Sequence, residues 1–275
     1  MKNNERVILI TGASSGIGLA CALYLSKKGY RVFGTSRHFP SPDFLETNGQ
    51  FFTVRMNVTI EGSVNKAVEA ILRKTGRIDV LINNAGFGLA GAIEDTLTEE
   101  TQKQFLTNFF GVHIVTRAVL PVMKKQNSGY IINISSLAAL IPLPFQAFYS
   151  ATKSALELMT ETLGMELKSV GSNIKVVLIQ PNDYCTKFTE NRQKVALWEK
   201  SSYLKRAEKA LEVAENGERN GPPPIQVARL VEKIINKKNP KLYYPVGSNA
   251  RLLALARKIL PAKILQKLVM KYFGI

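Results

Sequence analysis

A short apolar run that ends in a glycine-rich turn constrains the fold of this chain more than any other feature. Residues 6–11 are mostly β-branched, which is typical of a buried parallel strand. Gly12, Gly16 and Gly18 follow at once, and residues 19–28 have the pattern of a helix. Such a turn lets backbone N–H groups approach a pyrophosphate, which the helix N-terminus also attracts. The pattern predicts a nucleotide-binding strand–turn–helix unit.

Strands and helices alternate along most of the chain, as a doubly wound parallel sheet requires. The further strands are predicted at residues 31–35, 51–55, 78–83, 130–135, 174–179 and 241–246. Helices are predicted at 63–74, within 98–125, at 146–168 and after the prolines at 222–224. We therefore expect an α/β fold, a Rossmann-type doubly wound parallel sheet of about seven strands, in a single domain over residues 1–275.

Two segments differ from this alternation. Residues 182–221 carry many charges and scattered aromatics, and they follow a strand end, where open α/β sheets bind ligands. We interpret them as a substrate lid; the alternative is a charged helical hairpin on the surface. Residues 248–275 are predicted to form a basic amphipathic helical tail.

Tyr149 and Lys153 lie four residues apart in the predicted helix 146–168, so their side chains project from the same face. A neighbouring cation stabilises phenolate and lowers the tyrosine pKa from its reference near ~10. A tyrosine tuned in this way can exchange a proton with a carbonyl or alcohol oxygen. The spacing alone also fits a partly buried tyrosine beside a solvated lysine.

With its other motifs the chain resembles the short-chain dehydrogenase/reductase family. The matching residues appear in the family's order between residues 6 and 186. They are Gly12, Ser14, Ser15, Gly16, Ile17 and Gly18 of the turn, Asn84, Ala85 and Gly86 after a strand, and Asn108, Ser136, Tyr149 and Lys153. The resemblance implies hydride transfer between a nicotinamide cofactor, held by the turn and the Asn84 segment, and a carbonyl or alcohol carbon.

The resemblance also implies roles for four side chains. Tyr149 would be the acid/base, and Lys153 would lower its pKa and hold the nicotinamide ribose. Ser136 would polarise the substrate oxygen, with Ser135 pointing the other way. Asn108 would hold a water of a proton relay; its alternative is a helix residue that satisfies a nearby backbone group.

The residues at the end of the second predicted strand indicate whether the cofactor is NAD or NADP. The sequence there is Thr-Ser-Arg-His, with Arg37 in place of the acidic residue that accepts the ribose hydroxyls of NAD. A guanidinium suits a 2′-phosphate, so we predict NADP(H). The alternative is an exposed Arg37 that makes no ligand contact.

Two positions depart from the family pattern. Asn57 replaces an aspartate near the adenine, and its side chain can still accept a hydrogen bond. Pro181 is followed by Asn182 rather than glycine, and asparagine tolerates left-handed backbone angles. Thr186 falls where a family threonine helps to hold the nicotinamide side of the cofactor.

Charge is concentrated in the C-terminal part of the chain. The net charge is +16, and residues 219–275 contain twelve Lys or Arg against one acid, Glu232. This excess favours anionic surfaces; we find no nucleic-acid motif, and the amphipathic tail favours a membrane. Two cysteines, no signal peptide and no apolar run long enough to span a bilayer predict a cytoplasmic protein, peripheral at a membrane surface.

The last helix follows Pro261. Its apolar face is Ile264, Leu265, Leu268, Val269 and Tyr272, and its edge is Lys263, Lys267 and Lys271. Such a helix lies in a membrane interface or packs on the subunit or a dimer mate. Apolar residues between 137 and 145 would border a lipophilic substrate or serve as core.

These features predict an NADPH-dependent reductase of a lipophilic ketone or aldehyde. The candidate substrates are 3-ketosphinganine-like, hydroxysteroid-like and retinoid-like. A redox-responsive NADP(H)-binding regulator and a membrane-surface or nucleic-acid-associated protein are the alternatives. We expect a homo-oligomer, either a dimer or a tetramer, and no bound metal.

Overall fold

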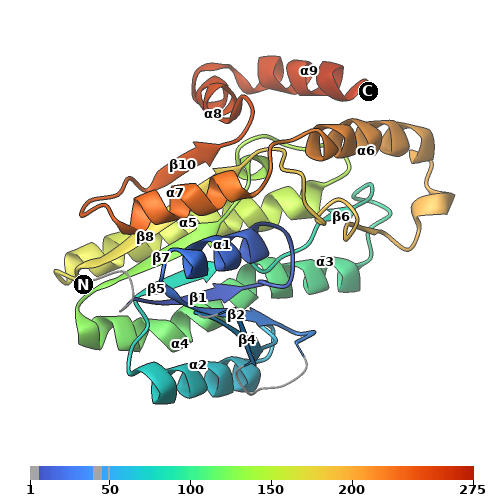
Figure 1. The fold of residues 1–275 in the computed structure, drawn as a ribbon. Helices are drawn as coiled ribbons and strands as arrows, with labels where there is room; N and C mark the ends of the chain where they lie inside the picture. Colours follow the sequence, from blue (N-terminus) through green and yellow to red (C-terminus); the bar gives the residue numbers. More distant parts are fainter. Residues whose placement is uncertain (1–5, 40–44, 49) are drawn as a thin grey trace.

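The computed structural model describes residues 6–39, 45–48 and 50–275. Its centre is an eight-stranded sheet in the order β10-β8-β7-β5-β1-β2-β4-β3 (Figure 1). The strands are β1 (Val7–Thr11), β2 (Arg31–Ser36), β3 (Leu45–Asn48), β4 (Phe51–Arg55), β5 (Val80–Asn83), β7 (Gly129–Ile134), β8 (Ile174–Pro181) and β10 (Tyr243–Val246). Neighbours pair in parallel except β3, which is antiparallel to β4. The predicted Rossmann-type sheet is confirmed; the antiparallel β3 was not predicted.

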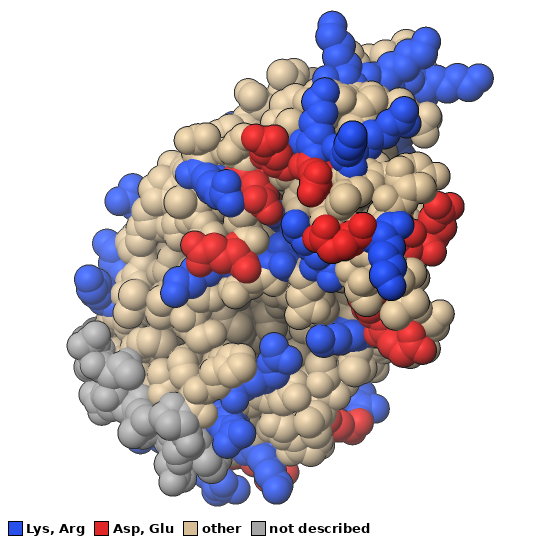
Figure 2. Space-filling view, turned by 90° about the vertical axis from the view of Figure 1, so that its right-hand side faces the viewer, with Lys and Arg blue, Asp and Glu red and all other residues tan. Residues whose placement is uncertain are grey.

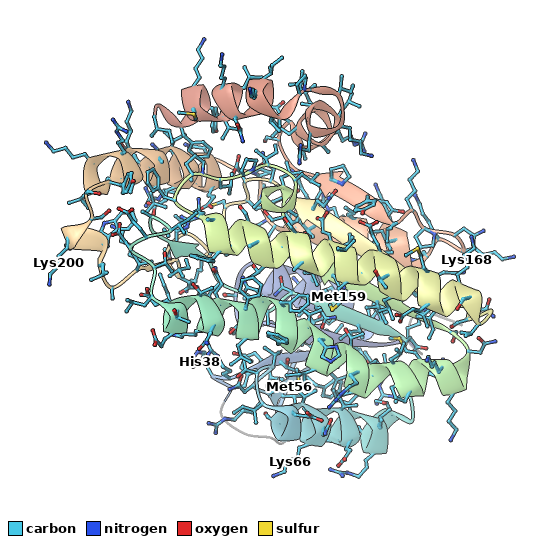
Figure 3. All side chains as sticks on the ribbon, turned by 180° about the vertical axis from the view of Figure 1, so that it is seen from behind. His38, Met56, Lys66, Met159, Lys168 and Lys200 are labelled. Carbon is cyan, nitrogen blue, oxygen red and sulfur yellow. The ribbon has the colours of Figure 1, made fainter. Side chains whose placement is uncertain are left out.

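Helices cover both faces of the sheet, which explains why its strands are continuous apolar runs. The helices α1 (Gly16–Lys27) and α7 (Ile225–Ile235) cover one face, and Cys21, Leu25, Val227 and Val231 are fully buried there. The other face carries α2 (Glu61–Thr75), α4 (Gly111–Gln126) and α5 (Ala147–Ser169), which cross the front of Figure 3.

One helical stretch corrects an expectation from the sequence. The helix α3 (Thr98–Phe105), a π-helical turn (Leu106–Phe110) and α4 form one run, Thr98–Gln126, long and apolar enough by length and composition to cross a membrane. We expected no such run. Here it packs along the sheet, with Val115, Val119 and Met123 fully buried, while Leu106 and Phe110 are exposed. About 33% of its apolar window is buried.

The segment 182–221 contains β9 (Gln193–Lys194), a 3₁₀ turn (Trp198–Lys200) and α6 (Leu204–Arg219). Strand β9 pairs with β6 (Leu89–Ala90), which follows β5, so the segment is tied to the carboxyl edge of the sheet. A small core of its own lies beneath it, with Leu89, Val195, Trp198 and Leu211 buried.

The tail forms two helices, α8 (Ala250–Ile259) and α9 (Ala262–Phe273), at the top of Figure 1. Helix α8 contacts β10, and α9 contacts both α6 and α8. The predicted helical tail is thus two helices, and its last helix begins directly after Pro261, as expected. The proline ring cannot supply the backbone N–H that a continuous helix needs. Residues 1–5, where we expected no signal peptide, lie outside the described residues.

Candidate active site

A cavity of about 1390 Å³ opens along the carboxyl ends of the parallel strands. Its wall includes residues that directly follow or end β1, β2, β4, β5, β7 and β8, and it continues beneath α6, α8 and α9. In Figure 3, His38 of this wall lies at the same side of the molecule as Lys200, whereas Lys168 at the end of α5 lies opposite. Ligands of open α/β sheets bind at this edge.

The glycine-rich turn forms one end of the cavity wall. Gly12 and Gly16 have φ of 67° and 56°, in the left-handed region that favours glycine. A Cβ on Gly18 would lie 2.3 Å from the Gly12 carbonyl oxygen and 2.5 Å from Asn84 Nδ2, so only glycine fits. Ser14, Ser15 and Ile17 line the same cavity. No side chain of these glycines blocks the backbone at this end of the cavity, and the contact with phosphates stays a prediction.

Hydrogen bonds fix the Asn84 segment against this turn. The Asn84 amide nitrogen Nδ2 donates to the carbonyl oxygens of Thr11 (2.9 Å) and Gly12 (3.0 Å). The backbone N–H groups of Asn84 and Ala85 donate to Thr11 Oγ1 at 2.9 and 3.0 Å. Asn84, Ala85 and Gly86 therefore line the cavity next to the turn.

Asn108 lies behind the cavity wall. Its side chain is 1% exposed, accepts from the Phe87 backbone N–H at 3.0 Å and donates to the Phe87 carbonyl at 2.9 Å. It also donates to Thr152 Oγ1 at 3.3 Å and stands on the π-helical turn. These contacts are those expected under the alternative interpretation of Asn108, in which it is a helix residue that satisfies nearby backbone groups. The relay role stays a prediction.

Tyr149 and Ser136 both line the cavity. The tyrosine is buried in the first turn of α5, and Ser136 caps a short 3₁₀ turn, accepting from the Ala138 N–H at 3.1 Å. Burial raises the pKa of Tyr149 to about 12, and a hydrogen bond with Ser136 opposes this rise. The expected lowering of the Tyr149 pKa by Lys153 is therefore wrong here, because loss of hydration outweighs nearby charge.

Lys153 is buried one turn after Tyr149, with its ammonium 5.9 Å from the centre of the tyrosine ring. It donates to the Ile134 carbonyl at 2.8 Å. Burial lowers its pKa to about 8, and the carboxylate of Glu157 opposes that change. Glu157 in turn accepts from Ser135 Oγ at 2.6 Å and from Gln180 Nε2 at 2.9 Å. Ser135 belongs to the cavity wall, but its hydroxyl is directed to Glu157.

At the end of β2, Arg37 is exposed and lines the cavity beside His38 and Ser36. The Ser36 hydroxyl donates to Ser14 Oγ at 3.2 Å, which links this strand end to the glycine-rich turn. Within the described ranges no ion pair of Arg37 is found. Its guanidinium is placed to meet an anion that also contacts the turn.

The sequence also predicted that Asn57, Pro181 and Thr186 contact the cofactor, and all three line the cavity. Asn57 lines the cavity, but its Oδ1 accepts from the Thr59 N–H (3.1 Å) and Oγ1 (2.9 Å), so its amide nitrogen is the group it offers. Pro181 lines the cavity. Thr186 packs against Gly16: a Cβ added to this glycine would lie 3.5 Å from the Cβ of Thr186.

Asn182 does not adopt the left-handed backbone that we expected. Its backbone N–H donates to the Val246 carbonyl at 2.9 Å and its side chain donates to the Ser248 carbonyl at 2.8 Å. Gly247, with φ of 110°, supplies the left-handed turn on the other side of this contact. The asparagine side chain thus anchors the strand end.

The segment 182–221 brings an aromatic ring and charged residues to the site. The ring of Phe188 lies 5.5 Å from that of Tyr149, and Arg192 packs on Phe188 at 5.3 Å. Arg192 is almost fully buried and pairs with Glu218. Asp183 lines the cavity with Glu218, and burial raises the pKa of Asp183, with Glu218 adding to the rise.

Our sequence analysis missed Glu157, Gln180, Phe188 and Asp183 as parts of the site. Glu157 had a usable signal, since it continues the four-residue spacing of Tyr149 and Lys153 along one helix face. The other residues come from segments whose approach to α5 depends on tertiary packing.

A glycine-rich strand–turn–helix and a buried Tyr–Lys pair in one cavity define a nicotinamide-dependent oxidoreductase site. The chain belongs to the short chain dehydrogenase family, whose family model matches residues 6–197.

Two curated relatives carry names that state a substrate. A 3-ketodihydrosphingosine reductase of Bacteroides thetaiotaomicron is 42% identical over 272 residues, covering 98% of each chain. Retinol dehydrogenase 8 of Homo sapiens is 39% identical over 192 residues, 66% of this chain and 60% of that protein. The resemblance to the family stated from the sequence is confirmed.

Solved structures share the fold. A short-chain dehydrogenase from Streptomyces avermitilis superposes with a TM-score of 0.81 at 26% identity, covering 100% of this chain and 98% of that one. A serine dehydrogenase complexed with NADP⁺ superposes with a TM-score of 0.74 at 25% identity, covering 88% of this chain and 94% of that one. A Burkholderia phymatum enzyme in complex with NAD reaches 0.78 at 23% identity, covering 94% and 95%. The match to the structure with NAD, at 23% identity, shows the shared fold only. Membership of the family implies a nicotinamide cofactor without distinguishing NAD from NADP.

Proposed function

We propose that this oxidoreductase uses NADPH to reduce a long-chain ketone, with 3-ketosphinganine-like amino ketones as its preferred substrates. One observation carries the proposal: a single cavity runs from Arg37 past Tyr149 to the apolar side chains of α8 and α9. At about 1390 Å³ it exceeds the roughly 300–1,000 Å³ of an ordinary ligand pocket. That volume accommodates a dinucleotide together with a long acyl chain.

Proton transfer is assigned to Tyr149. Its pKa of about 12 keeps the phenol protonated at neutral pH, which is the form that a reduction needs to protonate the carbonyl oxygen. Ser136 lines the same cavity and offers a second hydrogen-bond donor for that oxygen. The hydride for the carbonyl carbon would come from NADPH held by the glycine-rich turn and the Asn84 segment. Lys153, with a pKa of about 8, is mostly charged at neutral pH and stabilises the phenolate left behind.

The residues at the end of β2 fit NADPH. Arg37 and the linked hydroxyls of Ser36 and Ser14 line one part of the cavity, and none of the three is acidic. A carboxylate there would repel a 2′-phosphate, whereas a guanidinium binds it with charge-assisted hydrogen bonds.

The choice of an amino ketone over other lipophilic ketones has two supports. The Bacteroides relative that spans almost the whole chain is named for such a substrate. The carboxylate of Asp183 lines the cavity, and among the described residues it has no ion pair. A protonated amine offers this carboxylate a partner, which neutral retinoids and steroids do not.

The proposal is tested by following NADPH oxidation with a panel of ketones and by identifying the product. The panel contains a long-chain 2-amino-3-ketone, the same ketone without the amine, retinal and a ketosteroid. We expect the highest kcat/KM for the amino ketone. Tight NADPH binding without turnover of any ketone would support the alternative, an NADP(H)-binding regulator.

A further inference from the structure

Three apolar side chains of the tail line the cavity and are also open to solvent. Leu252 of α8 is 65% exposed, and Leu268 and Tyr272 of α9 are 51% and 62% exposed. A side chain with one surface on the cavity and another on the outside marks an opening. The cavity therefore has a mouth between α8 and α9, rimmed by apolar groups.

Helix α9 presents three parallel rows of side chains at four-residue spacing. Leu265, Val269 and Phe273 face inward and are the least exposed row. The next row, Ile264, Leu268 and Tyr272, is exposed and apolar, and the row beyond it is Lys263, Lys267 and Lys271, all exposed. Residues four apart lie on the same face of a helix, so an apolar strip borders a cationic strip along the whole helix.

Helix α8 repeats this arrangement. Leu252, Leu255 and Ile259 are exposed and occupy one face, at spacings of three and four residues. Arg251 and Lys258 lie seven residues apart beside that face. Figure 2 shows Lys and Arg gathered at the top of the molecule, where Figure 1 places α8 and α9.

The charge of this surface has one sign. Residues 248–275 contain six Lys or Arg and no Asp or Glu. A second copy of the chain would bring six further cations to the same apolar strips, which would repel each other. An anionic lipid surface complements both the cations and the exposed apolar side chains.

We propose that α8 and α9 form a docking surface for an anionic bilayer, with the cavity mouth opening directly onto the lipid. The apolar strips enter the boundary between headgroups and acyl chains, and the lysine row contacts the lipid phosphates. A lipid substrate then passes from the bilayer into the cavity without crossing water. That last step rests on the proposed function, whereas the docking itself does not.

Binding is measured by sedimentation of the full-length protein with vesicles of phosphatidylcholine alone or mixed with phosphatidylglycerol. We expect binding to the mixed vesicles that falls with rising salt. The variant Lys263→Gln/Lys267→Gln/Lys271→Gln should bind them about a hundredfold more weakly, since each lysine near such a surface contributes about fivefold. Its melting temperature should match that of the parent, because all three side chains are exposed.

A matched control changes three exposed lysines at the opposite end of the sheet, Lys124→Gln/Lys125→Gln/Lys168→Gln. The control has the same net charge as the tail variant and should bind vesicles nearly as the parent does. The pair Leu255→Ser/Ile259→Ser tests the apolar contribution, because both side chains are exposed and neither lines the cavity. We expect it to weaken binding at least about tenfold.

Two results would overturn the proposal. Equal losses in the tail and control variants would show attraction by net charge alone. A change of oligomeric state in Leu255→Ser/Ile259→Ser, together with no binding of the parent to mixed vesicles, would assign the surface to a second copy. Tyr149→Phe, which lacks the reacting phenol, should bind vesicles as the parent does, so a failure of the proposed activity leaves the docking test intact.

Discussion

The ring of Phe188 lies 5.5 Å from the ring of Tyr149, so a residue of the 182–221 segment packs against the phenol that we propose as proton donor. Burial is the main reason why the pKa of Tyr149 is raised to about 12. We predict that Phe188→Ala admits water and lowers this pKa toward its reference near ~10. In the proposed reaction the protonated phenol is the acid, so reductase activity should then be lost at a lower pH than in the parent.

The measurement is the pH dependence of kcat for reduction in both proteins. Phe188→Leu is the control, since it keeps an apolar side chain over the phenol and should retain the parental profile. Identical profiles for Phe188→Ala and the parent would mean that this ring does not set the environment of Tyr149.

The sequence predicted the sheet and the central pair for physical reasons. Parallel strands buried on both faces are apolar runs, and residues four apart share a helix face wherever the helix lies. The sequence predicted a lowered pKa for Tyr149, and the structure raises it. The prediction was wrong because the sequence shows the neighbouring Lys153 but not the burial of the phenol. Glu157 was missed although it continues the helix face of Tyr149 and Lys153; only its contacts with Ser135 and Gln180 depend on tertiary packing.

Short elements were missed for another reason. Strands β6 and β9 have two residues each and pair only because the 182–221 segment folds back over the sheet edge. The homo-oligomer, the cytoplasmic location and the movement of the lid stay predictions, because they concern partners and states beyond a single folded chain.

Cofactor preference should rest on Arg37. We predict that Arg37→Ala weakens NADPH binding by one to two decades, or roughly 1.5–3 kcal/mol, with little effect on NADH, which lacks the 2′-phosphate. Arg31→Ala is the matched control, since Arg31 begins the same strand, at the end away from the cavity. Titration of each variant with both cofactors decides the point, and equal weakening of NADPH and NADH would exclude a phosphate contact.

The glycine turn should tolerate no side chain at position 18. Gly18→Ala places a Cβ against the Gly12 carbonyl, which is backbone and cannot move aside, so we expect a loss of about 1–3 kcal/mol in stability and weaker NADPH binding. Gly164→Ala in α5 meets nothing within 4 Å and should stabilise by about 0.5–1 kcal/mol. Thermal melts of both variants test this contrast, and an unchanged Gly18→Ala would refute it.

Recognition of the substrate amine should involve Asp183. We predict that Asp183→Asn raises KM for a long-chain 2-amino-3-ketone at least about tenfold, because a charge-assisted hydrogen bond is lost. KM for the ketone without the amine should stay within a few-fold of the parent. Steady-state kinetics on the two substrates separate the effects. Equal changes for both substrates would assign Asp183 a structural role.

The central claim is that Tyr149 donates the proton in an NADPH-dependent reduction of a long-chain amino ketone. The most direct measurement compares NADPH oxidation by the parent and Tyr149→Phe with that substrate, beside cofactor affinity from titration. We predict that the variant loses about 10²–10⁴-fold in turnover while binding NADPH within a few-fold of the parent. A variant that reduces the amino ketone at a near-parental rate would contradict the claim.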